Sequence, residues 1–168
     1  MKQFIFIIIL FIFAACNENG PMTQCKLTKG FHYDMQGNAG CLVIENDKML
    51  LVRDFISGKL GPPGGGNEDH ETAPCTAARE TYEEAGLEVR VGQLLGTFGK
   101  GNFYLFRCYA LKQPVSLRAP VPFLGFSEIE EVLWLDPNLT QAKDWRFTSQ
   151  YDDMNRIFNY WLEQGRGL

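Results

Sequence analysis

Three glutamates, Glu80, Glu83 and Glu84, lie within five consecutive positions of the segment RETYEEAG. If this segment is helical, spacings of three and four residues place the three side chains on one face. Like charges at these spacings destabilise a helix by roughly 0.2–0.5 kcal/mol per pair. Open solvent would tolerate the cluster, whereas a divalent cation would offset the repulsion and take the carboxylate oxygens as ligands. The residues therefore indicate either an ordinary charged surface or a site for a hard cation such as Mg²⁺.

A loop rich in glycine and proline, GKLGPPGGGNED, precedes these glutamates, and its composition predicts neither strand nor helix. Glycine lets a backbone approach a bound group closely. A helix is predicted to begin after Thr72 as its N-cap, to accept Pro74 in its first turn and to end at Gly86. The loop and the acidic helix are therefore neighbours and form one candidate site.

Strand and helix signals alternate along the rest of the chain. The stretch CLVIENDKMLLVRDF predicts two apolar strands joined by a turn at Asn46 and Asp47. Further strands are predicted over EVRVGQLLGTF, NFYLFRCYAL and VLWLD, and the second of these is apolar on both faces, as a covered sheet requires. A final helix is predicted over SQYDDMNRIFNYWLEQG. One face of this helix carries a stripe formed by Tyr151, Met154, Phe158 and Trp161, which indicates core packing rather than a cofactor site.

Length and charge limit the possible functions. A chain of 168 residues with 45% hydrophobic content can form one domain with a sizeable core, but not two. The net charge is −4, and it becomes −5 without the first fifteen residues, whose only charged side chain is Lys2. Non-specific binding to nucleic acid is therefore not expected.

The N-terminus, MKQFIFIIILFIFAAC, predicts a secretory signal peptide over residues 1–15, because its apolar run is short for a membrane span and is followed by small residues. The ending FAAC resembles a bacterial lipobox, with Phe13 in place of the usual aliphatic residue, and implies lipidation of Cys16. Ordinary cleavage near Ala15 and an uncleaved anchor are the alternatives. We expect a membrane-anchored lipoprotein of the periplasm or cell envelope, with residues 16–36 as lipidated N-terminus, tether and lead-in.

Four further cysteines, Cys25, Cys41, Cys75 and Cys108, would lie in an oxidising compartment, where three pairings into two disulfides are possible. Alternatively, Cys75 and Cys108 are small buried hydrophobic residues. The sequence contains no CxxC motif and no histidine-rich spacing, so it does not indicate a zinc site.

The loop and helix together follow a longer pattern: Gly65, five residues, Glu71, seven residues, then RETYEEAGL. This pattern resembles the Nudix box, G-x5-E-x7-R-E-U-x-E-E-x-G-U, at every fixed position, and Thr81 stands where a bulky aliphatic residue is usual. The resemblance implies an α/β fold, a Nudix-type α-β-α sandwich with a mixed central sheet. We assign this domain to residues 37–168.

The resemblance also implies the roles of individual residues. Arg79 would pair with Glu71, Gly65 would set the turn from loop to helix, and Glu80 would be either a metal ligand or the general base. Glu68 is more simply explained as a loop residue. The implied catalytic residues are Glu71, Arg79, Glu80, Glu83 and Glu84, and the implied ligands of Mg²⁺ or Mn²⁺ are the carbonyl of Gly64, Glu80, Glu83, Glu84 and, from a later loop, Glu128.

The implied reaction is metal-dependent hydrolysis of the diphosphate linkage in a small nucleoside diphosphate derivative. A lipid diphosphate is the second choice, and a catalytically silent diphosphate-binding lipoprotein is the non-enzymatic alternative. An isopentenyl-diphosphate isomerase is disfavoured, because only His32 and His70 are available to a histidine-rich site. The runs GTFGKGNF and RAPVPFLGF could supply aromatic stacking or a contact from Lys100, but ordinary packing explains them equally well. The sequence does not indicate the substrate-binding residues or the oligomeric state.

Overall fold

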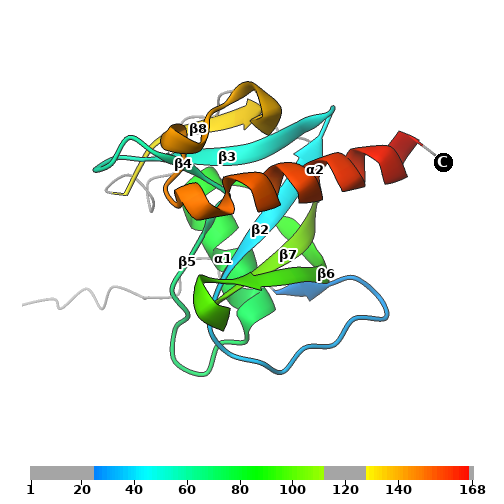
Figure 1. Cartoon of the computed structure of the whole chain (residues 1–168). Helices are drawn as coiled ribbons and strands as arrows, with labels where there is room; N and C mark the ends of the chain where they lie inside the picture. Colours follow the sequence, from blue (N-terminus) through cyan, green and yellow to red (C-terminus); the bar gives the residue numbers. More distant parts are fainter. Residues whose placement is uncertain (1–24, 112–127, 167–168) are drawn as a thin grey trace, which may run out of the picture.

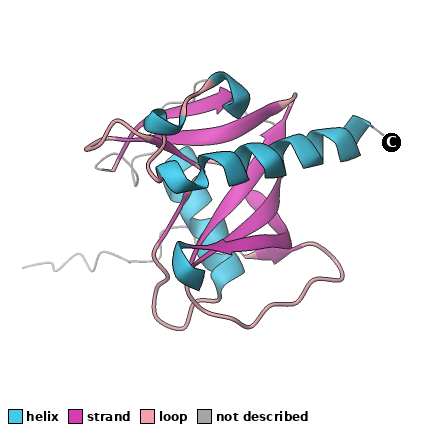
Figure 2. Ribbon diagram, viewed as in Figure 1, coloured by secondary structure: helices cyan, strands magenta, loops and turns pink. Residues whose placement is uncertain are grey.

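The structure, a computed structural model, describes residues 25–111 and 128–166, so residues 1–24 and the run RAPVPFLGF lie outside it. Two helices, α1 (Ala73–Ala85) and α2 (Tyr151–Arg166), accompany the strands (Figure 1; Figure 2). The strands are β1 (Lys26–Leu27), β2 (Asn38–Glu45), β3 (Lys48–Asp54), β4 (Leu60–Gly61), β5 (Gly64–Gly65), β6 (Val89–Phe98), β7 (Phe103–Ala110) and β8 (Ile129–Leu135). Short 3₁₀ turns are η1 (Gly99–Gly101), η3 (Pro137–Leu139), η4 (Ala142–Asp144) and η5 (Thr148–Gln150).

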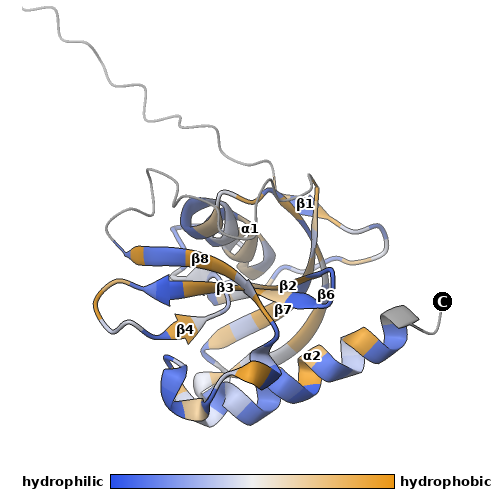
Figure 3. Cartoon of the chain, turned by 90° about the horizontal axis from the view of Figure 1, so that it is seen from above, coloured by the Kyte–Doolittle hydropathy of each residue, from blue (hydrophilic) through white to orange (hydrophobic). Residues whose placement is uncertain are grey.

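The described strands form a mixed sheet in the order β1-β6-β7-β2-β3-β4, with β5 beside β2 and β8 beside β3. The β1–β6 and β2–β7 pairs are parallel, and the other pairs are antiparallel. The two helices lie on opposite sides of the strands (Figure 3). The predicted α-β-α sandwich with a mixed central sheet is confirmed.

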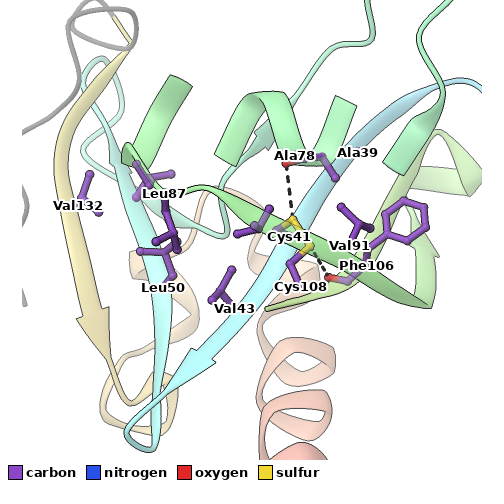
Figure 4. Packing of buried hydrophobic residues seen from close by; sticks show 14 of the residues in the cluster. Ala39, Cys41, Val43, Leu50, Ala78, Leu87, Val91, Phe106, Cys108 and Val132 are labelled. Atoms are coloured by element: carbon purple, nitrogen blue, oxygen red, sulfur yellow. Dashed lines mark hydrogen bonds between the residues drawn. A yellow bond between two sulfur atoms is a disulfide. The ribbon is translucent and has the colours of Figure 1, made fainter. Parts of the chain in front are cut away.

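Alternating side chains on the long strands build two cores, one under each helix. On β2, Cys41 and Val43 pack in the core shared with α1, whereas Leu42 packs in the core shared with α2. The first core is shown in Figure 4. In the second core, Met154 and Phe158 are buried and Tyr151 and Trp161 are partly buried, which confirms the predicted packing stripe of α2. No helix among the described residues has the length and apolarity needed to cross a membrane.

Local signals set the ends of several elements as predicted. Asn46 and Asp47 have φ values of 50° and 56° and form the turn between β2 and β3. Gly86 ends α1 in the left-handed conformation, with φ of 66°, and its N–H donates to the carbonyl of Tyr82. Thr72 occupies the N-cap position of α1, although its hydroxyl makes no capping hydrogen bond.

The prediction that the Gly/Pro segment contains no strand is wrong at two places, β4 and β5. In β5, Gly64 and Gly65 pair with Gly40 and Ala39 of β2. A side chain at Gly40 would place its Cβ 2.5 Å from the carbonyl oxygen of Pro63. The backbone of the loop can therefore lie this close to β2 only because position 40 is glycine. Pairing with a distant strand thus overrides the weak local preference and holds the loop against the sheet.

Two disulfides join the cysteines, Cys25 to Cys75 and Cys41 to Cys108. The alternative in which Cys75 and Cys108 are unpaired is therefore wrong. Register explains the second bridge, because Val43 lies opposite Cys108 and Cys41 lies on the same face of β2, with a Cα–Cα distance of 5.5 Å to Cys108 (Figure 4).

Candidate active site

The acidic face of α1 is not an ordinary charged surface. Glu80 is 8% exposed and Glu84 is 5% exposed, whereas the side chain of Glu83 is 32% exposed. Burial of ionised carboxylates is costly unless a cation or hydrogen-bond donors accompany them. The arrangement therefore excludes the solvated-face interpretation for Glu80 and Glu84.

Arg79 is the centre of the cluster. Its Nη1 donates to Oε1 of Glu80 and to Oε2 of Glu83, both at 2.9 Å. Its Nη2 donates to Oε2 of Glu71 at 3.0 Å and to the carbonyl oxygen of Gly66 at 2.7 Å. The predicted pairing of Arg79 with Glu71 is thus present, and it extends further than the sequence indicated. A single guanidinium joins the loop, the start of α1 and two of the three helical glutamates.

Glu71 has additional partners that hold it in its ionised form. The hydroxyl of Thr76 donates to Oε2 of Glu71 at 2.9 Å, and the N–H of Glu68 donates to the same oxygen at 3.1 Å. Burial raises the pKa of Glu71, but the hydrogen bonds from Arg79, Glu68 and Thr76 outweigh it and lower the pKa below its usual value. The side chain of Glu68 is 71% exposed, in keeping with its interpretation as a loop residue.

The glycine loop fits closely against the helix. The N–H of Gly64 donates to Oε2 of Glu84 at 2.8 Å. A Cβ at Gly65 would lie 2.6 Å from a carboxylate oxygen of Glu80, so only glycine leaves room for that carboxylate. The structure therefore corrects the role expected for Gly65, which lies in β5 and allows close approach to Glu80 instead of setting the turn to the helix. At Gly64 the observed contact comes from its N–H, and a role for its carbonyl as a metal ligand stays a prediction.

Burial shapes the acid–base properties of the cluster. Desolvation raises the pKa of Glu84 to about 8, opposed by the Gly64 N–H and reinforced by the negative charge of Glu80. Desolvation also raises the pKa of Glu80, although the Arg79 charge and hydrogen bond oppose this. For Arg79, burial would lower the pKa, but the hydrogen bonds that it donates to Glu71 and the surrounding carboxylates raise it instead. The four carboxyl groups of Glu71, Glu80, Glu83 and Glu84 outnumber the one guanidinium, and burial favours the protonated forms of Glu80 and Glu84.

Glu128 is exposed and lies close enough for its charge to raise the pKa of both Glu80 and Glu84. Its carbonyl accepts a hydrogen bond from the N–H of Phe55 at 2.8 Å, which fixes its backbone beside the end of β3. The structure thus brings Glu128 near the cluster, and its role as a ligand stays a prediction.

The chemistry of the donor set suits a hard cation. Carboxylate oxygens are the preferred ligands of Mg²⁺ and Mn²⁺, and such an ion would favour the ionised forms of these buried carboxyl groups. In the conformation described, Arg79 holds oxygens of Glu80 and Glu83. Across residues 25–111 and 128–166, no group of three or more His, Cys, Asp or Glu side chains is already arranged to hold a metal ion. Glu80, Glu83 and Glu84 are the residues that fit the ion best.

A cavity of about 670 Å³ adjoins the cluster and shares Gly64 with it. Phe98, Lys100 and Phe103, from the run GTFGKGNF, line this cavity. The cavity is also lined by three residues that the sequence did not indicate: Trp145, Arg146 and Phe147. They lie in the segment DWRFTS, which shows no periodicity or motif. Arg146 lines the cavity, and its positive charge lowers the pKa of Glu84.

Comparison with known proteins places this site in a family. Residues 35–154 match the NUDIX domain, and the chain belongs to this family. Diphosphoinositol polyphosphate phosphohydrolase 3-alpha from Mus musculus is 36% identical over 93 residues, which cover 51% of this chain and 57% of that protein. The chain thus matches little more than half the length of this relative.

Solved structures agree with this assignment. A NUDIX hydrolase from Nitrosomonas europaea is 26% identical with a TM-score of 0.60, and the match covers 77% of this chain and 73% of that one. An ADP-ribose pyrophosphatase from Streptococcus suis has a TM-score of 0.55 at 17% identity, over 71% of this chain and 89% of that one, and supports the fold alone.

The raised pKa of Glu84 predicts how pH and metal act together. Its folded pKa of about 8 lies above the ordinary value of 4.5, so its contribution to the stability of the metal-free protein is lost as pH rises between these values. If Glu84 is a ligand as predicted, Mg²⁺ would bind its deprotonated form, so the gain in melting temperature caused by Mg²⁺ is expected to grow with pH up to about 8. Melting curves with Mg²⁺ and with EDTA, from about pH 5.5 to about pH 8.5, measure this gain. Glu84→Gln should flatten the pH dependence, and an unchanged slope in that variant would contradict the assignment.

Proposed function

We propose that this chain is a Mg²⁺- or Mn²⁺-dependent pyrophosphohydrolase that cleaves the diphosphate linkage of a small nucleoside diphosphate derivative. The observation that supports it most is the buried carboxylate cluster held by Arg79 and joined at Gly64 to a cavity of about 670 Å³. A solvent-facing charge run would have neither the burial nor the adjoining cavity. Membership of the NUDIX family supports the same class of reaction.

The chain's own residues supply positioning and proton transfer. When bound, the cation neutralises phosphate charge and lowers the pKa of a water molecule. Arg79 orients Glu80 and Glu83 through hydrogen bonds of 2.9 Å to each. Burial raises the pKa of Glu80, which makes it a stronger base than an exposed carboxylate and suits it to accept a proton from the attacking water. Glu84, held by the Gly64 N–H, completes the carboxylate set.

Hydrolysis of a diphosphoinositol polyphosphate is a second candidate, favoured by the name of the mouse relative. A ring that carries many phosphates needs many cations around it. The chain as a whole carries a net charge of −4, which opposes the approach of such a polyanion. We therefore rank the nucleoside derivative above both the inositol compound and the lipid diphosphate.

A comparison of hydrolysis rates tests this order. Purified protein is assayed with ADP-ribose, a UDP-sugar, a diphosphoinositol polyphosphate and a short-chain polyprenyl diphosphate, each with Mg²⁺ and with EDTA. We expect the two nucleoside compounds to be cleaved fastest, and only with Mg²⁺. A preference for the inositol or polyprenyl compound would reverse the order. If none of the four compounds is hydrolysed with Mg²⁺ or with Mn²⁺, a silent diphosphate-binding protein would be favoured.

We also propose that the chain is exported and anchored to a membrane through lipidation of Cys16. The two disulfides support this, because disulfides persist in oxidising compartments such as the periplasm. We expect the wild-type protein in the membrane fraction and expect Cys16→Ser to be released from it or to accumulate unprocessed. Unprocessed wild-type protein in the cytoplasmic fraction would refute both export and anchoring.

A further inference from the structure

The cavity beside Gly64 has the size of a ligand site. Its volume of about 670 Å³ lies within the range of roughly 300–1,000 Å³ that is usual for small-molecule sites. Three segments that are distant in sequence form most of its walls: the loop from Lys59 to Gly64, the β6–β7 hairpin tip from Thr97 to Phe103, and a segment that runs from Trp145 through Asp153. Residues of β2 and β3 complete the lining: Asn38, Val52 and Asp54. Convergence of three segments next to the carboxylates makes this cavity the natural place for the part of the substrate that is not cleaved.

Two aromatic side chains in the lining are suited to contact a flat ring. Phe147 is 58% exposed although it lines the cavity, so much of its surface is open to a ligand. Phe103 packs closely on the loop, since a Cβ at Gly64 would lie 2.9 Å from its ring. Phe103 therefore links the cavity wall to the residue whose N–H holds Glu84. Exposed aromatic surface stacks on any nucleobase, because every base has a π-face.

The charges of the lining do not suit a polyanion. Among the described residues, the basic members are Lys59, Lys100 and Arg146, and the acidic members are Asp54 and Asp153. Two of these cations already have partners: Nζ of Lys59 donates to the carbonyl of Lys143, and Nη2 of Arg146 lies 3.6 Å from Asp54. A neutral ring with one or two phosphates matches this lining better than a ring covered with phosphates.

We infer that this cavity is the specificity pocket for the nucleoside of the substrate, with its base against Phe147 and Phe103 and its nearest phosphate beside Arg146. The inference rests on the proposed function and names the residues that select the substrate. Asn102 and Gln150 line the same cavity and offer amide donors and acceptors to the edge of the base. Arg146 suits one phosphate because its side chain lines the cavity and is 46% exposed, and because a guanidinium has five N–H donors, more than its contact of 3.6 Å with Asp54 uses.

Binding of AMP and of ribose 5-phosphate, which differ only by the base, tests the pocket without catalysis. Calorimetry on the wild-type protein is expected to show AMP bound at least about tenfold more tightly, the size expected from stacking of one base. Phe147→Ala should remove most of this preference by weakening AMP alone. Arg146→Gln should weaken both ligands equally. Tyr160→Ala is the matched control, because Tyr160 is 55% exposed on α2 and lies outside the described lining.

The outcomes separate the pocket from the proposed function. Equal affinity of the wild type for the two ligands, or the same preference in Phe147→Ala as in Tyr160→Ala, would overturn the pocket assignment even if diphosphates are hydrolysed. A base preference that depends on Phe147 would uphold the pocket even if no diphosphate is hydrolysed, and would leave the protein as a nucleotide-binding one. Rescue of AMP binding by Phe147→Trp would further support stacking over a merely structural effect.

Discussion

Replacing Glu83 with glutamine is expected to lower Mg²⁺-dependent turnover by at least about a thousandfold, equivalent to roughly 4 kcal/mol of transition-state stabilisation. Glu83 is a carboxylate of the acidic face, and its Oε2 accepts a hydrogen bond from Arg79. The amide oxygen of glutamine can accept the same hydrogen bond, so the helix and the Arg79 network should persist. The charge that a metal ion requires is lost, and activity is lost with it.

Glu130→Gln is the matched control, because Glu130 is exposed on β8 and its substitution by glutamine removes the same charge. Its turnover and melting temperature should remain close to those of the wild type. Steady-state rates with Mg²⁺ and with EDTA, together with melting curves, separate loss of chemistry from loss of fold. Near-normal Mg²⁺-dependent activity of Glu83→Gln would show that Glu83 is not part of the metal site.

Removal of the Cys41–Cys108 disulfide by double substitution with alanine is expected to lower the free energy of unfolding by about 2–5 kcal/mol. The bridge spans 67 residues of sequence, and both cysteines are 0% exposed in the core beneath α1. Loss of the bridge enlarges the unfolded ensemble, and loss of the two sulfurs weakens packing. Urea denaturation without reductant measures the change.

The Cys25–Cys75 bridge provides the comparison, because it spans 50 residues but its two cysteines are only partly buried. Substitution of Cys25 and Cys75 by alanine should cost less, since it removes a similar chain constraint with less packing. Equal stability of the wild type and the Cys41→Ala/Cys108→Ala variant would contradict the importance of the core bridge. Titration of free thiols in the purified, unreduced protein should detect none of these four cysteines.

Local patterns in the sequence predicted much of the secondary structure. The turn at Asn46 and Asp47 and the end of α1 at Gly86 depend on backbone conformations that these residue types adopt readily. The packing stripe of α2 follows from helical periodicity. In each case the determining interactions lie within a few residues of one another, so the sequence carries the signal.

Contacts between distant segments were not predictable in the same way. Pairing of β5 with β2, and of Cys41 with Cys108, depends on the sheet register, which no local signal specifies. The site shows the same division. The box predicted the glutamates and the Arg79–Glu71 pair, but the approach of Arg146 to Glu84 depends on a segment more than sixty residues away. Thr76 was missed although it lies within five residues of Glu71, because a threonine at the start of a helix has many ordinary roles.

The guanidinium of Arg79 acts as an internal counter-ion for the acidic face, because it lies within hydrogen-bonding distance of Glu71, Glu80 and Glu83. Maturation of such a protein can therefore proceed in two separate stages. The polypeptide can reach its native state while divalent ions are scarce, since part of the repulsion is already neutralised by a covalently attached charge. Under the proposed function, recruitment of the ion would then be a reversible step governed by its local concentration, and ion supply would switch activity on without refolding the chain.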